Sequence, residues 1–417
     1  MSRLVQSLTA LRAPQHILAA LEILQLQTPS ADRLTFLTDA ERQRFLKWCD
    51  DRQLTLMLSQ ACRSRLPAWA LEPTLQKTAR YELRFRRLKK ELFEIAESLD
   101  QASLEFVMLK GLSHAPALTP NAQLRAQGDI DLWLIGSSAH KAQDVLKKLG
   151  YVPLLDSKSR HLPPMGRPSN WQWRGDPFDP EMPISVELHY DLWSEAEEYI
   201  AVPDIEQFWE RKKLRDFDGH KINVLCDEDL LGFAALHLML HLLHGDLPLQ
   251  RAWEIARFLD THMDDEFFWT SWRNAHSTAL AQVETSIFHI VTDWFGCRSR
   301  QELGADVQKL PVPVKSWLGK FSLAPLTREW APNKLEIWLH LAFISSRKDK
   351  AFVLFRRLFP TSLPFFVDRA VPRPSLPVKL LKCARQLNLL LNRLVHHVVT
   401  FFPTIFDGVR WYWLRKS

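Results

Sequence analysis

The segment Gly128-Asp129-Ile130-Asp131-Leu132-Trp133-Leu134 constrains this chain most, because acidic and apolar residues alternate along it. Side chains at positions i and i+2 of a β-strand lie on the same face of the strand. The alternation predicts a short strand with Asp129 and Asp131 on one face and Ile130 and Leu132 in apolar packing on the other. Two neighbouring carboxylates repel each other and are costly to bury, and a divalent cation removes both difficulties.

A third acid stands in a second segment of the same kind, Ile184-Ser185-Val186-Glu187-Leu188-His189. Oxygen-rich clusters of carboxylates hold Mg²⁺ in enzymes of phosphoryl and nucleotidyl transfer. We therefore expect Asp129, Asp131 and Glu187 to be the catalytic acids and to bind Mg²⁺ or Mn²⁺. In the alternative interpretation these are solvated acids at strand ends, which the apolar flanking residues disfavour.

Composition narrows the class of protein. The chain has 417 residues, enough for two or three domains, and only 13 are glycine. Neither GxxxxGK[ST] nor GxGxxG occurs, so a glycine-rich nucleotide loop is excluded. The five cysteines are scattered without a CxxC pair, and no apolar run approaches the roughly 20 residues needed to cross a bilayer. These features predict a cytoplasmic protein with reduced thiols.

Positive charge is concentrated at the C-terminal end. From Arg347 onward there are 14 Lys and Arg against three Asp, so this part carries 14 − 3 = +11, and the rest of the chain carries 6 − 11 = −5. The acidic balance of residues 1–346 makes nucleic acid an unlikely main partner. The last helix is expected to pack one apolar face against its own domain, a face made of Leu380, Ala384, Leu387, Leu391, Leu394 and Val398. Alternatively, residues 379–417 contact an anionic membrane or an acidic partner.

The order of predicted elements divides the chain into four parts. Residues 1–100 are predicted to be a helical N-terminal region, 101–225 a catalytic domain, 226–345 a helical domain and 346–417 a basic helical tail. Alternating strand and helix patterns in 101–225 indicate an α/β unit around a mixed sheet, and residues 156–183 form a long irregular excursion within it. The fold class is therefore α+β, a small α/β domain flanked by helical regions.

Two helical segments raise specific expectations. Over Tyr81 to Leu99 an amphipathic helix is predicted, with Leu83 on the apolar side and Arg84 on a solvated, charged side. Further along, His237, His241 and His244 lie at i, i+4 and i+7 on one face of a helix. Three histidines without a cysteine or carboxylate motif favour packing, or one histidine reaching the active site, over a zinc site.

The motifs together resemble the polymerase-β-like nucleotidyltransferase superfamily, specifically a bacterial branch of nucleotidyltransferase-family proteins. The resemblance rests on Leu109-Lys110-Gly111, on R-x-x-x-D-I-D-L at Arg125 to Leu132, and on Glu187-Leu188-His189. It also includes His241 ahead of Trp253-Glu254-Ile255-Ala256, and it covers roughly residues 1 to 370. Glu187 departs from the family pattern, in which Asp is commoner at this position.

The resemblance implies a Mg²⁺-dependent enzyme that transfers a nucleoside monophosphate from an NTP, with ATP as the first choice, to a hydroxyl group and releases pyrophosphate. The acceptor is left open among a peptide, protein, sugar or small molecule. The nucleotide-binding residues would be Lys110, Gly111, Arg125, Gly128 and His189. Two other functions stay open, a non-catalytic protein that binds a nucleotide or partner, and a peripheral membrane factor acting through the basic tail.

Overall fold

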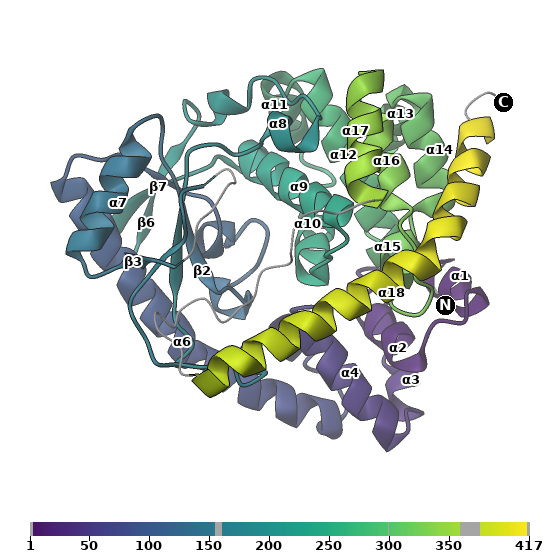
Figure 1. The fold of residues 1–417 in the computed structure, drawn as a ribbon, viewed down its shortest axis with the longest axis horizontal. Helices are drawn as coiled ribbons and strands as arrows, with labels where there is room; N and C mark the ends of the chain where they lie inside the picture. Colours follow the sequence, from purple (N-terminus) through teal and green to yellow (C-terminus); the bar gives the residue numbers. More distant parts are fainter. Residues whose placement is uncertain (1–2, 155–160, 299, 359–375, 415–417) are drawn as a thin grey trace.

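The computed structural model describes residues 3–154, 161–298, 300–358 and 376–414 (Figure 1). Within the last helix several side chains, among them those of Lys379, Lys382, Arg385 and Arg393, lie outside the described set. The described residues form a mixed α+β structure, which confirms the predicted fold class.

The strands of the sheet all lie between Val107 and Val224. They are β1 (Val107–Met108), β2 (Asp129–Trp133), β3 (Val152–Pro153), β4 (Met165–Gly166), β5 (Ser185–His189), β6 (Lys213–Phe217) and β7 (His220–Val224). Their order in the sheet is β3-β4-β5-β2-β1-β7-β6, with β2 parallel to β5, β1 parallel to β7 and the other pairs antiparallel. The excursion was predicted to be irregular throughout, which is wrong for Met165–Gly166, because this strand pairs with β5. Residues 155–160, which include the start of the excursion, lie outside the described set.

One face of the sheet packs against two helices, α6 (Ala68–Gln101) and α7 (Ser138–Lys148). Ile130 and Leu132 of β2 belong to this core, together with Val186 and Leu188 of β5. Since successive side chains of a strand alternate between faces, Asp129 and Asp131 must lie on the other face. That face is turned toward the helices of the C-terminal half.

The N-terminal region and the C-terminal half share one hydrophobic core. The N-terminal helices are α1 (Arg3–Ala10), α2 (Gln15–Ile23), α3 (Asp32–Thr35), α4 (Asp39–Asp51) and α5 (Thr55–Ala61). The helices after the sheet are α9 (Asp227–His244), α10 (Leu249–Thr261), α11 (Glu266–Ala275), α12 (Thr278–Phe295), α13 (Gln301–Lys309), α14 (Val312–Phe321), α15 (Ala324–Thr327), α16 (Glu336–Phe343), α17 (Arg347–Leu358) and α18 (Leu376–Leu414). Between them lie α8 (Glu195–Glu198) and the 3₁₀ turns η1 (Gly111–His114), η2 (Ala122–Leu124) and η3 (Ile205–Phe208).

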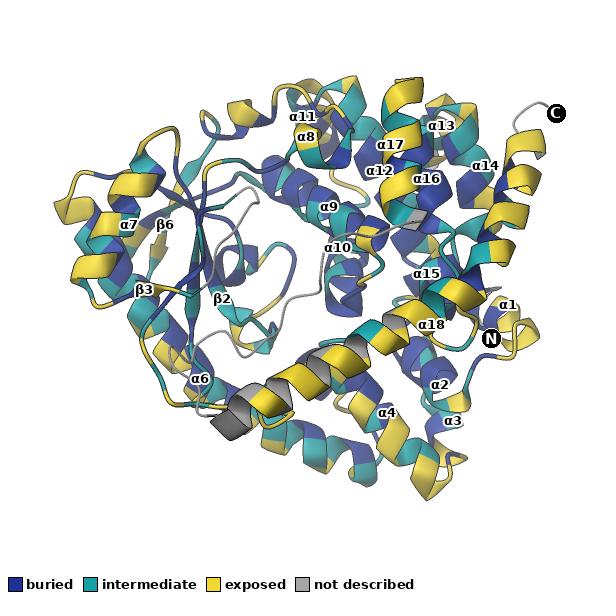
Figure 2. Cartoon of the chain, viewed as in Figure 1, coloured by how far each residue is buried: buried dark blue, intermediate teal, exposed yellow. Residues whose placement is uncertain are grey.

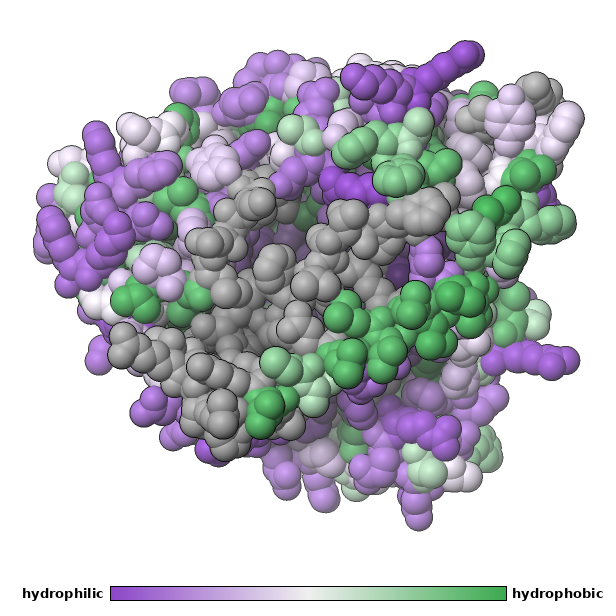
Figure 3. All heavy atoms as spheres, in the orientation of Figure 1, coloured by the Kyte–Doolittle hydropathy of each residue, from purple (hydrophilic) through white to green (hydrophobic). Residues whose placement is uncertain are grey.

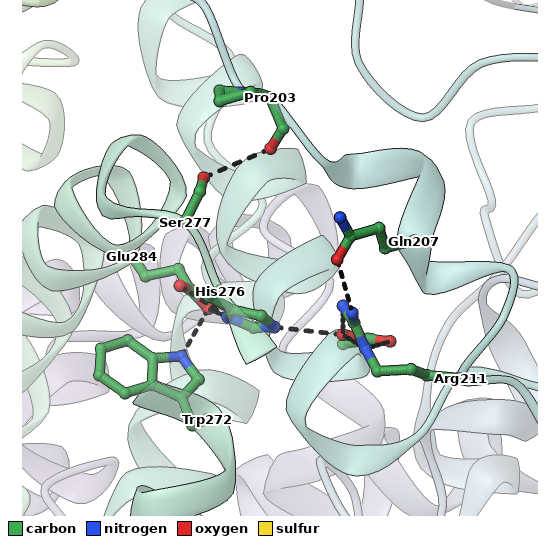
Figure 4. Close-up of polar contacts among 8 residues, drawn as sticks. Pro203, Gln207, Arg211, Trp272, His276, Ser277 and Glu284 are labelled. Carbon is green, nitrogen blue, oxygen red and sulfur yellow. Dashed lines mark hydrogen bonds and ion pairs between the residues drawn. The ribbon is translucent and has the colours of Figure 1, made fainter. Parts of the chain in front are cut away.

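A buried polar cluster ties the segment before β6 to the C-terminal helices (Figure 4). His276, at the end of α11, contacts Glu284 of α12 at 2.9 Å and Asp229 of α9 at 3.2 Å. Asp229 also accepts a 2.7 Å hydrogen bond from Arg211, and Glu284 accepts one of 2.9 Å from Trp272. Because the side chains of His276, Asp229 and Glu284 are fully buried, each charge in the cluster depends on its neighbours.

The last helix, α18, lies across the N-terminal and C-terminal helices (Figure 1). It was expected to bury the face that carries Leu380, Leu387, Leu391, Leu394 and Val398, and this expectation is wrong. These side chains are exposed, and α18 packs through Thr400, Thr404, Gly408 and Trp411 instead (Figure 2). No helix in the described part of the chain is both long and apolar enough to cross a membrane.

Candidate active site

The acidic face of the sheet is built by two adjacent parallel strands in matching register. Asp131 of β2 is the direct partner of Glu187 of β5, and Asp129 is the partner of Ser185. Parallel strands paired in phase present partner side chains on the same face. The expectation that Asp131 and Glu187 would come from neighbouring strands therefore agrees with the structure.

His189 joins these two acids, because it follows Glu187 by two residues on the same face of β5. The Nε2 atom of His189 lies 2.9 Å from Asp131 Oδ1 and 3.7 Å from Glu187 Oε2. Possible ligand atoms of Asp131, Glu187 and His189 all lie within 4.8 Å of one another. Such a spacing allows one cation to be shared among the three side chains.

The donor set of this cluster fits a divalent cation. The second carboxylate oxygen of Asp131, Oδ2, is buried and has no hydrogen-bond partner among the described residues. An unsatisfied buried carboxylate oxygen is costly, and a bound cation would satisfy it. Lys110 supplies positive charge to the same carboxylate, because its Nζ donates a 2.8 Å hydrogen bond to Asp131 Oδ1.

Asp129 lies two residues before Asp131 on β2 and shares the acidic face of the strand with it. The group of Asp131, Glu187 and His189 does not include it, since its partner on β5 is a serine. Burial and the neighbouring Asp131 carboxylate raise the pKa of Asp129. Burial would also raise the pKa of Asp131, but Lys110 and His189 hold that pKa below its ordinary value. The two aspartates thus have pKa values that are shifted in opposite directions, and a bound cation would favour ionisation of both.

The Lys110-Gly111 turn packs closely against Gln127, in the loop before the acidic strand. Gly111 has φ of +74°, and a Cβ atom there would lie 2.3 Å from Oε1 of Gln127. A single 3₁₀ turn, Gly111–His114, begins at this glycine. The positive φ favours glycine at this position, and any other residue would also displace the side-chain amide of Gln127, the residue that precedes Gly128 and Asp129.

Arg125 is buried against the second half of the chain. Its Nε lies 3.3 Å from a carboxylate oxygen of Glu254 on α10, in the Trp253-Glu254-Ile255-Ala256 motif. Glu254 also accepts a 3.0 Å hydrogen bond from Gln250 and lies 3.4 Å from His114. Burial would raise the pKa of Glu254, but Arg125 and His114 lower it to about 2. Arg125 therefore already has a protein carboxylate as its partner.

Helix α6 holds the loop between Arg125 and β2. Tyr81 donates to the carbonyl of Arg125 at 2.7 Å and accepts from the backbone N–H of Gln127 at 2.9 Å. The guanidinium of Arg84 donates to the carbonyls of Gln127, Gly128, Met182 and Pro183. The prediction of a solvated Arg84 and a buried Leu83 is wrong: Arg84 is 0% exposed and Leu83 is 52% exposed. The carbonyls ahead of both acidic strands offset the cost of burying the Arg84 charge.

Arg251, on α10, was not predicted from the sequence. Its Nη1 donates to ring nitrogens of His237 at 2.5 Å and His241 at 2.6 Å, while its Nε is buried and has no hydrogen-bond partner among the described residues. Burial and Arg125 lower the pKa of Arg251 to about 10, against the effect of Asp129 and Asp131. Arg251 lies three residues before Glu254 on the same side of α10, and this spacing is the sequence feature that could have marked it as a site residue.

The three histidines of α9 do not converge on one site. His237 and His241 contact Arg251, whereas His244 lies 3.1 Å from Glu198. The sequence interpretation also missed His161, whose Nε2 lies 3.7 Å from Glu187 Oε2 and whose ring centre lies 5.2 Å from that of His189. No motif in the excursion marks His161, because it reaches the site only through the fold.

Paired acids on one face of a mixed sheet, with Lys110 beside them, form an arrangement that can hold a divalent cation for phosphoryl or nucleotidyl transfer. Residues 38–296 match the model of the family described as "Uncharacterised nucleotidyltransferase". The chain belongs to this family, as the motif resemblance predicted. No curated protein and no solved structure matches the chain.

Proposed function

We propose that the protein is a Mg²⁺-dependent nucleotidyltransferase that moves a nucleoside monophosphate from an NTP to a hydroxyl acceptor. Membership of the nucleotidyltransferase family supports nucleotidyl transfer in general. The observation that carries the proposal is the pairing of Asp131 with Glu187, together with the unsatisfied Oδ2 of Asp131.

In this proposal Asp131 and Glu187 hold the cation, with His189 beside them and Asp129 as the further acid. The cation would neutralise the triphosphate and the charge that develops on the transferred phosphoryl group. Lys110 and Arg251 add positive charge next to the acids, and Gly111 and Gly128 shape the backbone around the nucleotide. Arg125 positions this loop through Glu254.

The reaction needs no nucleophilic side chain of the protein. An acceptor hydroxyl attacks the α-phosphorus in line, the bond to the β-phosphate oxygen breaks, and pyrophosphate leaves with the electron pair. We propose ATP as the NTP, a peptide or sugar as the acceptor, and a bacterial cytoplasmic setting, as expected from the sequence. The four-part division at residues 100, 225 and 345 remains part of the proposal.

The test incubates the full-length protein with each α-labelled NTP, Mg²⁺ and a cell extract, and follows label transfer together with pyrophosphate release. The proposal predicts a labelled product with one or more NTPs and none with γ-labelled NTP. Asp131→Asn is the catalytic control and the exposed Asp144→Asn is the matched surface control. Mg²⁺-dependent NTP binding without any transfer would favour the non-catalytic alternative.

A further inference from the structure

The outer face of α18 is an exposed apolar stripe. It is formed by Leu387, Leu391, Leu394, Val395, Val398, Val399, Phe402, Ile405, Phe406 and Val409, which are 41% to 77% exposed. These positions recur every three or four residues, so they lie along one side of the helix over about 33 Å. In Figure 3 the stripe is the green band that follows α18 across the viewed face.

The helix is attached to the body of the protein by its opposite side, which is small and polar. Thr400 and Thr404 are buried, and a Cβ atom at Gly408 would lie 2.1 Å from the ring of Trp338 on α16. Trp411 donates from Nε1 to the carbonyl of Pro313 at 3.3 Å. A helix of a water-soluble domain ordinarily buries its apolar side, so α18 has the reverse orientation.

Helix α17 carries the same combination of side chains. Phe352 and Phe355 are 48% and 61% exposed, and the basic residues Arg347, Lys348 and Arg356 are exposed on the same helix. Figure 3 shows apolar atoms over α17 on the same side of the molecule as the α18 stripe. The exposed apolar surface therefore extends beyond one helix.

Charge decides what kind of surface can cover this stripe. Residues 376–417 contain seven Lys and Arg and one Asp, 7 − 1 = +6. A second copy of the chain would bring +6 against +6, which disfavours self-association. A nucleic acid would satisfy the charge but offers no apolar environment along the length of the stripe. An anionic lipid surface satisfies both the charge and the apolar side chains.

We propose that the outer side of α18, with Phe352 and Phe355 of α17, binds the surface of a membrane that contains anionic lipid. The apolar stripe enters the boundary between headgroups and acyl chains, α18 lies in the membrane plane, and the exposed Arg410 contacts the headgroups together with the exposed basic residues of α17. This interaction is independent of the proposed nucleotidyl transfer.

The experiment is co-sedimentation of the full-length protein with vesicles of phosphatidylcholine alone or of phosphatidylcholine mixed with phosphatidylglycerol. Binding is expected with the mixed vesicles, should weaken as salt rises, and should be absent with phosphatidylcholine alone. The double variant F402E/F406E should lose about tenfold in affinity for each phenylalanine. The matched control is F267E on α11, where the phenylalanine is 82% exposed and far from the stripe in sequence.

A second variant covers the case in which F402E/F406E does not fold. Arg410→Glu changes one exposed charge and leaves the stripe intact, and it should weaken binding to the mixed vesicles only. Equal sedimentation of the parent, F402E/F406E and F267E with the mixed vesicles would overturn the proposal. Failure of the parent protein to bind anionic vesicles would also overturn it. Light scattering measures the oligomeric state of the same proteins. If the parent is a dimer that does not bind vesicles, and F402E/F406E is a monomer, the stripe is an interface with a second copy of the chain.

Discussion

Arg125 and Glu254, which are separated by 129 residues in sequence, form a buried ion pair between the loop before β2 and helix α10. The pair connects the R-x-x-x-D-I-D-L motif with the Trp253-Glu254-Ile255-Ala256 motif. The ion pair gives the Trp253-Glu254-Ile255-Ala256 motif a physical role, because Glu254 neutralises the buried charge of Arg125. The acidic strand is placed by contacts from both halves of the molecule.

Breaking this pair should destabilise the fold. Arg125→Gln or Glu254→Gln leaves one buried charge without its partner, so each variant should lose about 3–5 kcal/mol of unfolding free energy. The double variant R125M/E254M should lose clearly less than the sum of the matching single Met variants, because neither charge remains. Urea unfolding of the single and double variants measures the coupling. Additive losses would mean that the two residues act independently.

Removing the acid at position 131 should abolish metal-dependent nucleotide binding. Asp131→Asn removes a charged oxygen from the cluster with Glu187 and His189, and Mg²⁺-dependent affinity for a non-hydrolysable NTP should fall at least about a hundredfold. Calorimetry with and without Mg²⁺ provides the measurement, and Asp144→Asn on α7 should behave as the parent. Full metal-dependent binding by an Asp129→Asn/Asp131→Asn protein would remove the basis of the assignment.

Lys110 should contribute directly to nucleotide affinity. Lys110→Met should weaken binding by about 1.5–3 kcal/mol, the range for hydrogen bonds to charged groups. The exposed Lys141→Met on α7 is the matched control for loss of one lysine. A thermal melt separates binding from folding, because Lys110 also pairs with Asp131. If affinity is unchanged while the melting temperature falls, Lys110 has a structural role only.

Arg84 should be a structural residue in spite of its place in a charged helix. Arg84→Met removes the donor to several backbone carbonyls and should cost about 1–3 kcal/mol of unfolding free energy. Arg86→Met, two residues along the same helix, breaks an exposed pair with Glu82 and should cost less than about 1 kcal/mol. Equal losses in the two variants would contradict the position of Arg84 in the structure.

The His276 cluster predicts a dependence of stability on pH. Burial lowers the pKa of His276, but Glu284 and Asp229 together raise it to about 9, above the ordinary value of 6.5. The folded state therefore binds this proton more tightly than the unfolded state. Its contribution, up to about 3 kcal/mol, is fully present below pH 6.5 and is lost as pH rises through 9.

Urea unfolding at pH 6, 7.5 and 9 tests this contribution, with His276→Gln as the variant and His289→Gln as the control. His289 sits in a partly exposed pair with Asp293 on α12, so its removal should leave the pH dependence unchanged. The difference in unfolding free energy between the parent and His276→Gln should shrink as pH approaches 9. A difference that stays constant over this range would mean that His276 is not charged in the folded protein.

Local sequence patterns were sufficient to predict the strands and helices that carry the candidate site residues. The period-2 alternation around Asp129 and Asp131 predicted β2 and the face on which the acids lie, and the same pattern around Glu187 predicted β5. The amphipathic pattern over Tyr81 to Leu99 predicted a helix, which is part of α6, and the helix predicted to carry His237, His241 and His244 is α9. Each of these features depends on interactions between near neighbours in the chain, which a single sequence records.

The contacts between these site residues depend on the tertiary structure. The grouping of His189 with Asp131 and Glu187, the pairing of Arg125 with Glu254, and the approach of Arg251 and His161 all join residues distant in sequence. Arg84 and the apolar side of α18 both show that residue type alone does not decide burial. A charged residue is buried because carbonyls of other segments surround it, and an apolar stripe is exposed because the opposite side of its helix fits the body of the protein. Hydropathy patterns give the sides of a helix, but only the packing of the whole chain decides which side is covered.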